Sequence, residues 1–197
     1  MRLLRQAAEI LRADGVIAYP TDSAYALASR LRNKRGVERL RAIRRLGPRH
    51  NFTLICRDLA SIAAYARVNN RNFRLLKAFT PGPYTFILPA TREVPKALMH
   101  PKRRTVGIRV PDHLVVNGLL EEMGEPILST TLILPDQQDP MNDPGAVEAV
   151  LGTQIELIID SGFCGLEPST VVDLTGDTPH VVRAGKGEWE EAASEAV

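Results

Sequence analysis

Four polar side chains that could do chemistry lie close together in the stretch YPTDSAYAL, residues 19–27. Thr21 and Ser23 offer hydroxyl groups, Asp22 offers a carboxylate, and Tyr25 offers a ring with a polar tip. The stretch follows the apolar run GVIAYP, and open α/β sheets bind ligands in loops that follow buried strands. It could equally be a strand-to-helix turn in which Asp22 or Ser23 caps the next helix, and both interpretations can hold together.

A second group of candidate residues lies late in the chain. Ser169 and Thr170 begin the apolar run of PSTVVDL, and RAGKG supplies Arg183 and Lys186. These two cations are the only Lys or Arg residues after Arg109. Either they pair with acidic neighbours at the surface, or they complete a binding site for an anion.

The charges of the chain are separated along its length. Residues 1–109 contain 23 Lys and Arg against 6 Asp and Glu, whereas residues 110–197 contain 2 against 17, although the net charge is only +2. The two halves could simply attract each other within one fold. The alternative is a cationic surface for polyanions, with phosphates as the obvious candidates.

Hydrophobic periodicity predicts helices alternating with strands, followed by three late strands with only turns between them. Because strands joined by turns pair mostly antiparallel, we expect a mixed sheet with helices packed on it. Asn33, Asp58, Asp112 and Asp143 are the expected helix caps, and Gly15 is an expected helix stop. The expected helices are residues 1–15, 33–47, 58–66, 69–79, 93–99, 112–124 and 143–152, and the expected strands are 15–20, 52–57, 84–90, 104–111, 126–135, 155–160, 169–174 and 180–185.

The sequence lacks the ordinary motifs of NTPases, dehydrogenases, zinc hydrolases and esterases. The sequence has no P-loop, no G-x-G-x-x-G, no H-E-x-x-H and no G-x-S-x-G motif.

Cys56 and Cys164 are far apart in the sequence, which favours a protein of a reducing compartment in which both are small buried residues. We expect the four histidines to be surface or packing residues. No signal peptide and no apolar run long enough for a bilayer is present, so we expect a cytoplasmic protein without a membrane partner.

Five segments occur together in a fixed order: YPTDSAYAL, TPGPYTFIL, TVGIRVPDH, PSTVVDLT and VVRAG. With them the chain resembles the YrdC/YciO family over about residues 5–187, and HNFTLICRDL resembles the YciO branch. The resemblance implies one α/β (α+β) domain of the YrdC/RibB-like type over residues 5–187, followed by an acidic tail at 188–197. It also implies a twisted mixed parallel/antiparallel sheet with flanking helices and a large concave basic cavity.

The resemblance implies binding of a nucleotide and of double-stranded RNA or tRNA. Characterised relatives make threonylcarbamoyl-AMP from L-threonine, bicarbonate and ATP with release of pyrophosphate, for the t6A modification of tRNA. ATP with Mg²⁺ is then a substrate, and neither a tightly bound cofactor nor a protein-held metal is expected. The alternative is a protein that binds double-stranded RNA or tRNA without turnover, favoured by nine Lys and Arg against one acid in residues 30–50.

Site residues follow from the same resemblance, motif by motif. Each group matches positions that contact one part of the substrates or the RNA. The implied threonine-binding residues are Thr21, Tyr25 and Ser169; the implied nucleotide-binding residues are Arg44, Ser129, Thr131, Thr170 and Arg183; the implied catalytic residues are Arg44 and Arg109; and the implied RNA-binding residues are Arg41, Arg45 and Arg49.

The sequence departs from the synthase pattern at the nucleotide. Synthases carry Lys-x-Arg-Pro and a His on the next strand, whereas this chain has Arg44, Leu46 and Cys56 at those places. Thr131 replaces an Asn that reaches the nucleotide. Since an ammonium and a guanidinium group bind phosphate with different geometry, we expect an altered phosphate site.

Overall fold

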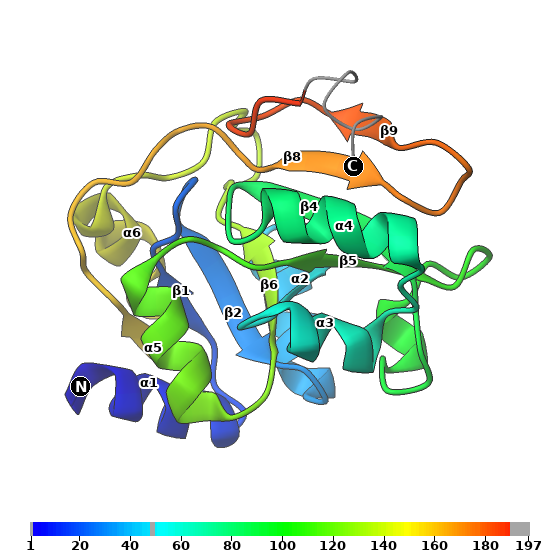
Figure 1. The fold of residues 1–197 in the computed structure, drawn as a ribbon. Helices are drawn as coiled ribbons and strands as arrows, with labels where there is room; N and C mark the ends of the chain where they lie inside the picture. Colours follow the sequence, from blue (N-terminus) through cyan, green and yellow to red (C-terminus); the bar gives the residue numbers. More distant parts are fainter. Residues whose placement is uncertain (1, 48–49, 190–197) are drawn as a thin grey trace.

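The structure, a computed structural model, describes residues 2–47 and 50–189. One sheet of nine strands runs through this part of the chain (Figure 1). The strands are β1 (Ile17–Tyr19), β2 (Ala26–Arg30), β3 (Thr53–Ile55), β4 (Tyr84–Pro89), β5 (Thr105–Arg109), β6 (Ile127–Thr131), β7 (Leu157–Ile158), β8 (Thr170–Asp173) and β9 (His180–Arg183).

The sheet is mixed, as predicted. Its strand order is β7-β1-β2-β6-β3-β5-β4-β8-β9. The pairs β1/β7, β3/β5 and β4/β8 are parallel, and the other five neighbouring pairs are antiparallel. The prediction for the three late strands was wrong in part, because only β8 and β9 pair with each other. β7 pairs with β1, and β8 pairs with β4 on its other side. The length of a connecting turn does not predict pairing with strands so far away in the sequence.

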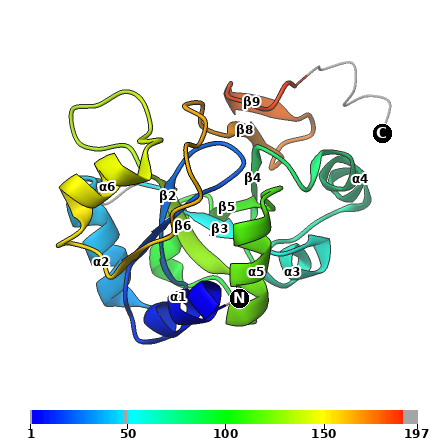
Figure 2. The same cartoon turned by 90° about the vertical axis from the view of Figure 1, so that its left-hand side faces the viewer.

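The helices flank the sheet, and several of their caps were read correctly (Figures 1 and 2). The backbone N–H groups of Gly36, Ser61 and Gly145 donate to the side chains of Asn33, Asp58 and Asp143, respectively, at 2.8, 2.7 and 2.9 Å. The helices are α1 (Arg2–Arg12), α2 (Lys34–Ile43), α3 (Leu59–Tyr65), α4 (Asn70–Phe79), the 3-10 turn η1 (Lys96–Leu98), α5 (Leu114–Met123) and α6 (Pro144–Leu151).

Two local predictions were wrong. His113, not Asp112, caps α5, because its Nδ1 accepts from the backbone N–H of Val115 at 3.3 Å. The loop at residues 20–25 leads into strand β2 and not into a helix, so neither Asp22 nor Ser23 is a helix cap. The segment ALASR of β2 has little of the β-branched or aromatic character by which strands are recognised.

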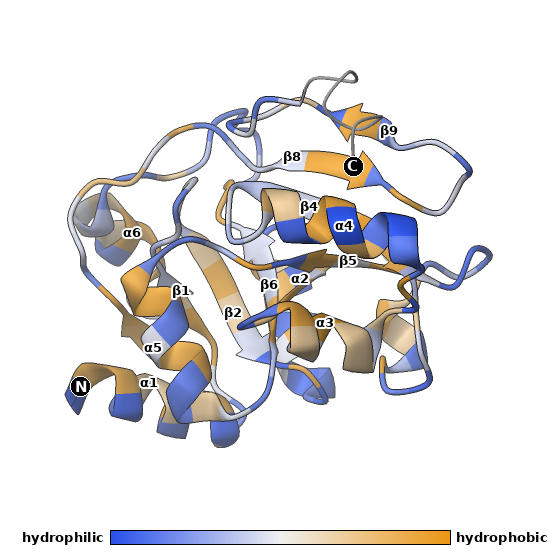
Figure 3. Cartoon of the chain, in the orientation of Figure 1, coloured by the Kyte–Doolittle hydropathy of each residue, from blue (hydrophilic) through white to orange (hydrophobic). Residues whose placement is uncertain are grey.

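The alternation of side chains along the strands divides the core into two clusters. Ile55 and Ile127 belong to a cluster with buried residues of α1 and α5. Leu54, Ile108 and Phe86 belong to a larger cluster with buried residues of α2, α3, α4 and α6. The helices accordingly show alternating hydrophobic and hydrophilic bands in Figure 3. The sheet is thereby held from both sides.

The expected acidic tail begins as a packed segment. Trp189 stacks on Phe79 at the end of α4, with ring centroids 4.5 Å apart, and the Tyr84 hydroxyl donates to the Glu188 carbonyl oxygen at 2.7 Å. The remainder of the tail, residues 190–197, lies outside the described residues.

Candidate nucleotide pocket

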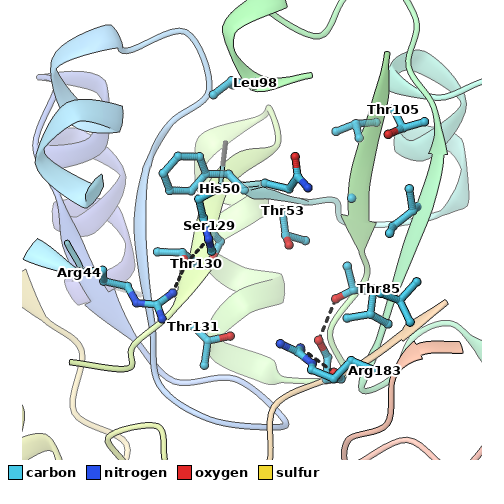
Figure 4. Close-up of a pocket in the computed structure, with 18 of the residues that line it drawn as sticks. Arg44, His50, Thr53, Thr85, Leu98, Thr105, Ser129, Thr130, Thr131 and Arg183 are labelled. Atoms are coloured by element: carbon cyan, nitrogen blue, oxygen red, sulfur yellow. Dashed lines mark hydrogen bonds between the residues drawn. The ribbon is translucent and has the colours of Figure 1, made fainter. Parts of the chain in front are cut away.

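A pocket of about 270 Å³ opens on the middle of the sheet (Figure 4). Strands β3, β4, β5, β6, β8 and β9 supply side chains to it, together with the end of α2. No Asp or Glu of residues 2–47 and 50–189 lines the pocket. Its polar lining consists of Arg44, His50, Asn51, Thr53, Thr85, Arg103, Thr105, Ser129, Thr130, Thr131, Ser169 and Arg183.

Small residues in register form the floor of the pocket. Thr53 of β3 lies beside Ser129 of β6 on one side and Gly107 of β5 on the other. A Cβ atom on Gly107 would lie 3.4 Å from Thr85 Cγ2 and 3.6 Å from Thr53 Oγ1. The glycine therefore leaves open the space that any side chain would fill. The hydroxyl of Ser129 is held by the buried Tyr19 hydroxyl at 2.7 Å.

Arg44 projects into the pocket from the C-terminal end of α2 (Figure 4). Its Nη1 donates to the Thr130 hydroxyl at 2.6 Å, and its Nε donates to the Ile133 carbonyl oxygen at 2.9 Å. Burial and then the positive charge of Arg183 lower the pKa of Arg44 to about 10. Arg44 is therefore still charged at neutral pH, but it is poorly solvated.

Arg183 faces Arg44 across the pocket from the end of β9 (Figure 4). Its Nη2 donates to the Ser169 carbonyl oxygen at 2.7 Å, and the Ser169 and Thr85 hydroxyls are 2.8 Å apart. Desolvation and then the charge of Arg109 lower the pKa of Arg183. Neither Arg44 nor Arg183 forms an ion pair with a carboxylate of the described residues, so two cations meet here with only neutral oxygens as partners.

Arg109 has a different environment beside the pocket. Its side chain is 7% exposed and pairs with Asp22 Oδ1, while its Nη1 donates to the Ser23 hydroxyl at 3.0 Å. The other oxygen of Asp22 accepts from the backbone N–H of Asp112 at 3.2 Å. The Nε of Arg109 is buried, and no hydrogen-bond partner for it lies within the described ranges.

The residues predicted for the substrates divide into two groups. Arg44, Ser129, Thr131, Ser169 and Arg183 all line the pocket, although they come from four separate parts of the sequence. The structure thus brings the greater part of the predicted nucleotide site together.

The other predicted substrate residues do not line the pocket. The Thr21 hydroxyl donates to the Ala24 carbonyl oxygen at 2.7 Å, within its own turn. The Tyr25 hydroxyl donates to the Gly162 carbonyl oxygen at 2.9 Å, and the Thr170 hydroxyl donates to the Gly187 carbonyl oxygen at 2.5 Å. These three hydroxyl groups hold loops around the site.

The predicted RNA-binding residues have local partners. Arg41 lies over the Phe52 ring at 5.0 Å, and Arg45 pairs with Asp136 at 3.5 Å. Arg49 lies outside the described residues. Of the many cations in residues 1–109, only Arg44 and Arg103 line the pocket within the described ranges, so the expectation that the cationic half lines the cavity is met in part.

Sequence reasoning missed His50, Thr53, Thr85 and Thr130, which also line the pocket. His50 Nε2 lies 3.4 Å from the Thr130 hydroxyl, and burial followed by the charges of Arg44 and Arg41 lowers the pKa of His50 to about 4. Thr53 and Thr85 alternate with apolar residues on their strands, which is also the pattern of any half-exposed strand, and Thr130 lies in the polar end of β6 between Ser129 and Thr131. Only the register between strands shows that they share a cavity.

Two further observations concern metal-binding groups and membrane-spanning helices. Within residues 2–47 and 50–189, no three His, Cys, Asp or Glu side chains are grouped so that they could hold a metal ion. In the same ranges, no helix has the length and apolar character needed to span a bilayer.

Comparison with known proteins extends this description. Residues 9–185 match the Sua5/YciO/YrdC family, which carries the description "Telomere recombination". YciO of Escherichia coli strain K12 is 51% identical over 187 residues, which cover 95% of this chain and 91% of YciO. Its crystal structure superposes with a TM-score of 0.93 over 96% of this chain and 92% of that one.

Weaker similarity extends to proteins with a named activity or ligand. Threonylcarbamoyl-AMP synthase of Vibrio vulnificus strain YJ016 is 32% identical over 159 residues, which cover 79% of this chain and 84% of the synthase. The crystal structure of P. abyssi Sua5 complexed with L-threonine is 26% identical, with a TM-score of 0.85 over 92% of this chain and 54% of that one. The chain therefore belongs to the Sua5/YciO/YrdC family.

Proposed function

We propose that the pocket binds a nucleotide and that the protein is a threonylcarbamoyl-AMP synthase-like enzyme with an altered phosphate site. L-threonine, bicarbonate and ATP are the substrates, with Mg²⁺ carried by the ATP phosphates. Threonylcarbamoyl-AMP and pyrophosphate are the products, and the threonylcarbamoyl group serves tRNA modification. The similarity to the V. vulnificus synthase and to Sua5 with L-threonine supports this proposal.

The observation that carries the proposal is the pair Arg44 and Arg183. Two poorly solvated guanidinium groups face each other with neutral partners only, and no carboxylate of the described residues lines the pocket. Such an arrangement is costly until an anion binds between the cations. A phosphate chain fits, because guanidinium groups donate in the forked geometry that phosphate oxygens accept.

The reaction requires positioning more than covalent chemistry. The amine of threonine attacks the carbon of bicarbonate, a C–O bond breaks, and a carbamate forms with loss of one water molecule. A carbamate oxygen then attacks the α-phosphorus of ATP. The bond from that phosphorus to the bridging oxygen breaks, and pyrophosphate leaves with the electron pair. Arg44 and Arg183 stabilise the charge on the phosphates, while Ser129 and Thr131 orient them. The cavity shields the labile product from water.

The threonine end of the site lies toward Arg109 in this proposal. Arg109, buried against Asp22, positions this end of the site, and the Ser169 hydroxyl is a polar contact for the carboxylate or carbamate of the substrate. Thr21 and Tyr25 shape this end through the loops that their hydroxyls hold. Thr170 does the same for the strand end beside Ser169.

Pyrophosphate release from MgATP tests the proposal, provided that it depends on both threonine and bicarbonate. Arg44→Ala should lower the rate at least tenfold, since it removes a charged donor. Arg109→Ala should lower it as well, and thermal unfolding is measured beside it because this variant leaves Asp22 buried without its counterion. Arg35→Ala is a matched control, because Arg35 lies on the same helix as Arg44 but is exposed and outside the pocket. Release that is no higher than in the Arg44 variant would remove the enzymatic proposal.

Binding of RNA without turnover is the second candidate function. It is favoured by the basic segment at residues 30–50, which includes Arg41, Arg45 and Arg49. Retention of tRNA should weaken as salt is raised, because phosphate contacts release counterions. Retention that does not respond to salt would contradict this candidate.

A further inference from the structure

We propose that a second hollow beside the pocket binds an unpaired stretch of RNA, with a base on its apolar floor and phosphates on its basic rim. This inference rests on the RNA partner of the proposed function and gives that partner a place. The hollow, called here the groove, lies between the start of α2 and the segment 91–98, and its volume is about 490 Å³.

The floor of the groove is apolar. Leu31, Val37, Pro95, Ala97 and Leu98 line it. Leu98 also lines the nucleotide pocket, so the two hollows share a wall. A molecule that occupies the groove therefore lies next to the proposed reaction site.

The rim of the groove is positively charged. Arg32, Lys34, Arg41 and Arg92 line it. The only carboxylates that line it, among the described residues, are Glu93 and Glu38, which already pair with Arg32 at 3.1 Å and with Lys34 at 4.0 Å. A net positive charge therefore remains for a ligand.

The neighbouring chain extends this charge. Residues 91–104 contain five Lys and Arg but one acid, Glu93. Lys96, Lys102 and Arg104 are exposed, and no ion pair joins them to a carboxylate of residues 2–47 or 50–189. The face of α2 that carries Arg39, together with the turn that follows the helix, differs, since Arg39 pairs with Glu156 at 2.8 Å and Arg45 pairs with Asp136 at 3.5 Å. Phosphates are thus attracted to the groove and its wall more strongly than to that face.

An apolar floor beneath cations suits a single strand better than a duplex. The base faces of a duplex are stacked and covered, whereas an unpaired base can lie against the aliphatic floor and stack on a guanidinium plane; no aromatic side chain of the described residues lines the groove. The backbone that follows such a base keeps phosphates within reach of Arg92 and Lys96. Both surfaces of the groove are then used by one ligand.

Fluorescence anisotropy with a fluorescein-labelled 12-nucleotide RNA tests this inference, with the duplex of the same sequence as the comparison. We expect the single strand to bind more tightly. The double variant Arg92→Gln/Lys96→Gln should weaken its binding and lower the slope of log K against log salt by about 1.4, or about 0.7 for each lost phosphate contact. Arg71→Gln/Lys77→Gln on α4 is the matched control and should leave affinity and slope nearly unchanged.

Val37→Ser tests the floor separately. It should weaken binding of the single strand about fivefold while leaving the salt slope unchanged, because it removes apolar contact and no charge. Thermal unfolding of the variant checks that the fold is retained. Equal binding of the duplex, or equal losses in the α4 control, would overturn the inference. Capture of a polyglutamate peptide with the same dependence on Arg92 and Lys96, without RNA binding, would assign the groove to an acidic protein and overturn it too.

The same variants separate this inference from the enzymatic proposal. Arg92, Lys96 and Val37 lie outside the nucleotide pocket, so pyrophosphate release should persist in their variants. Loss of RNA binding with intact pyrophosphate release supports the groove. Absence of pyrophosphate release in the unaltered protein, with RNA binding intact, removes only the enzymatic proposal.

Discussion

Three arginine side chains are buried or half-buried in neighbouring parts of the molecule: Arg109 beside the pocket, and Arg44 and Arg183 within it. Arg109 is neutralised by Asp22, whose carboxylate also accepts from the backbone at Asp112. Arg44 and Arg183 have only neutral oxygens as partners. The charge of Arg109 is thus compensated by a carboxylate of the fold, whereas the charges of Arg44 and Arg183 have no carboxylate partner among the described residues.

Because of this difference, we expect mutations at Asp22 or Arg109 to lower the stability of the fold, and mutations at Arg44 or Arg183 to lower the affinity for a ligand. Removing a partner from a buried ion pair leaves a charge without compensation, which destabilises the fold. Removing a cation that has no carboxylate partner relieves repulsion and desolvation, so its cost should fall on ligand binding. Stability and affinity measurements on the same variants can therefore test whether Arg109 differs from Arg44 and Arg183 in this way.

The largest effect is expected for Asp22→Asn. The variant leaves Arg109 buried and charged without its counterion, so the free energy of unfolding should fall by about 3–5 kcal/mol. Urea denaturation at pH 7 measures it. Asp136→Asn is the control, because its pair with Arg45 is exposed and should contribute less than about 1 kcal/mol. Similar losses in the two variants would show that Arg109 is not neutralised in the way described.

Arg44→Ala should act on affinity. We expect pyrophosphate or ATP to bind about 10- to 100-fold more weakly, because a charged hydrogen-bond donor contributes about 1.5–3 kcal/mol. Titration calorimetry measures the affinity, and Arg35→Ala is the control. Unfolding should change much less than for Asp22→Asn. A large loss of stability with unchanged affinity would reverse the roles given to the two arginine environments.

His50 should make the pocket sensitive to acid. Its pKa of about 4 in the folded protein lies below the usual 6.5, so the unfolded chain binds more protons between these values. The free energy of unfolding should therefore decrease as the pH falls from 6.5 to 4, on the order of 1 kcal/mol for this half-buried group. His50→Gln should flatten this part of the dependence. An identical pH profile in the variant would show that His50 is not desolvated.

Features that depend on residues close together in the sequence, such as helix caps, were predicted from the sequence. Contacts that depend on the register between strands were not. Asn33, Asp58 and Asp143 were recognised as caps because each contacts a backbone group only two or three residues away. Asp22 was recognised as a polar candidate, but its partner Arg109 is 87 residues distant. No local pattern contains such a pairing.

The candidate site shows the same limit. Five of the predicted residues line the pocket. The residue pattern alone grouped Ser169 with Arg183, and only the resemblance to a family joined them to Arg44, Ser129 and Thr131. Thr53 and Thr85 look like ordinary alternation on two strands. They share a cavity only because β3 and β4 both pair with β5, which places Gly107 between them. The hollow is a property of the sheet and not of any one segment.

Gly107→Ala tests that property with the smallest expected effect. The added methyl would meet Thr85 Cγ2 at 3.4 Å and Thr53 Oγ1 at 3.6 Å, which are ordinary contacts, so the fold should keep its stability. The methyl would, however, occupy the floor of the pocket, where the proposed nucleotide and its hydration water would lie. Nucleotide affinity should therefore fall about two- to fivefold, which is under 1 kcal/mol. Crystallography or calorimetry that finds affinity unchanged would mean that the ligand binds above the floor, held by Arg44 and Arg183 alone.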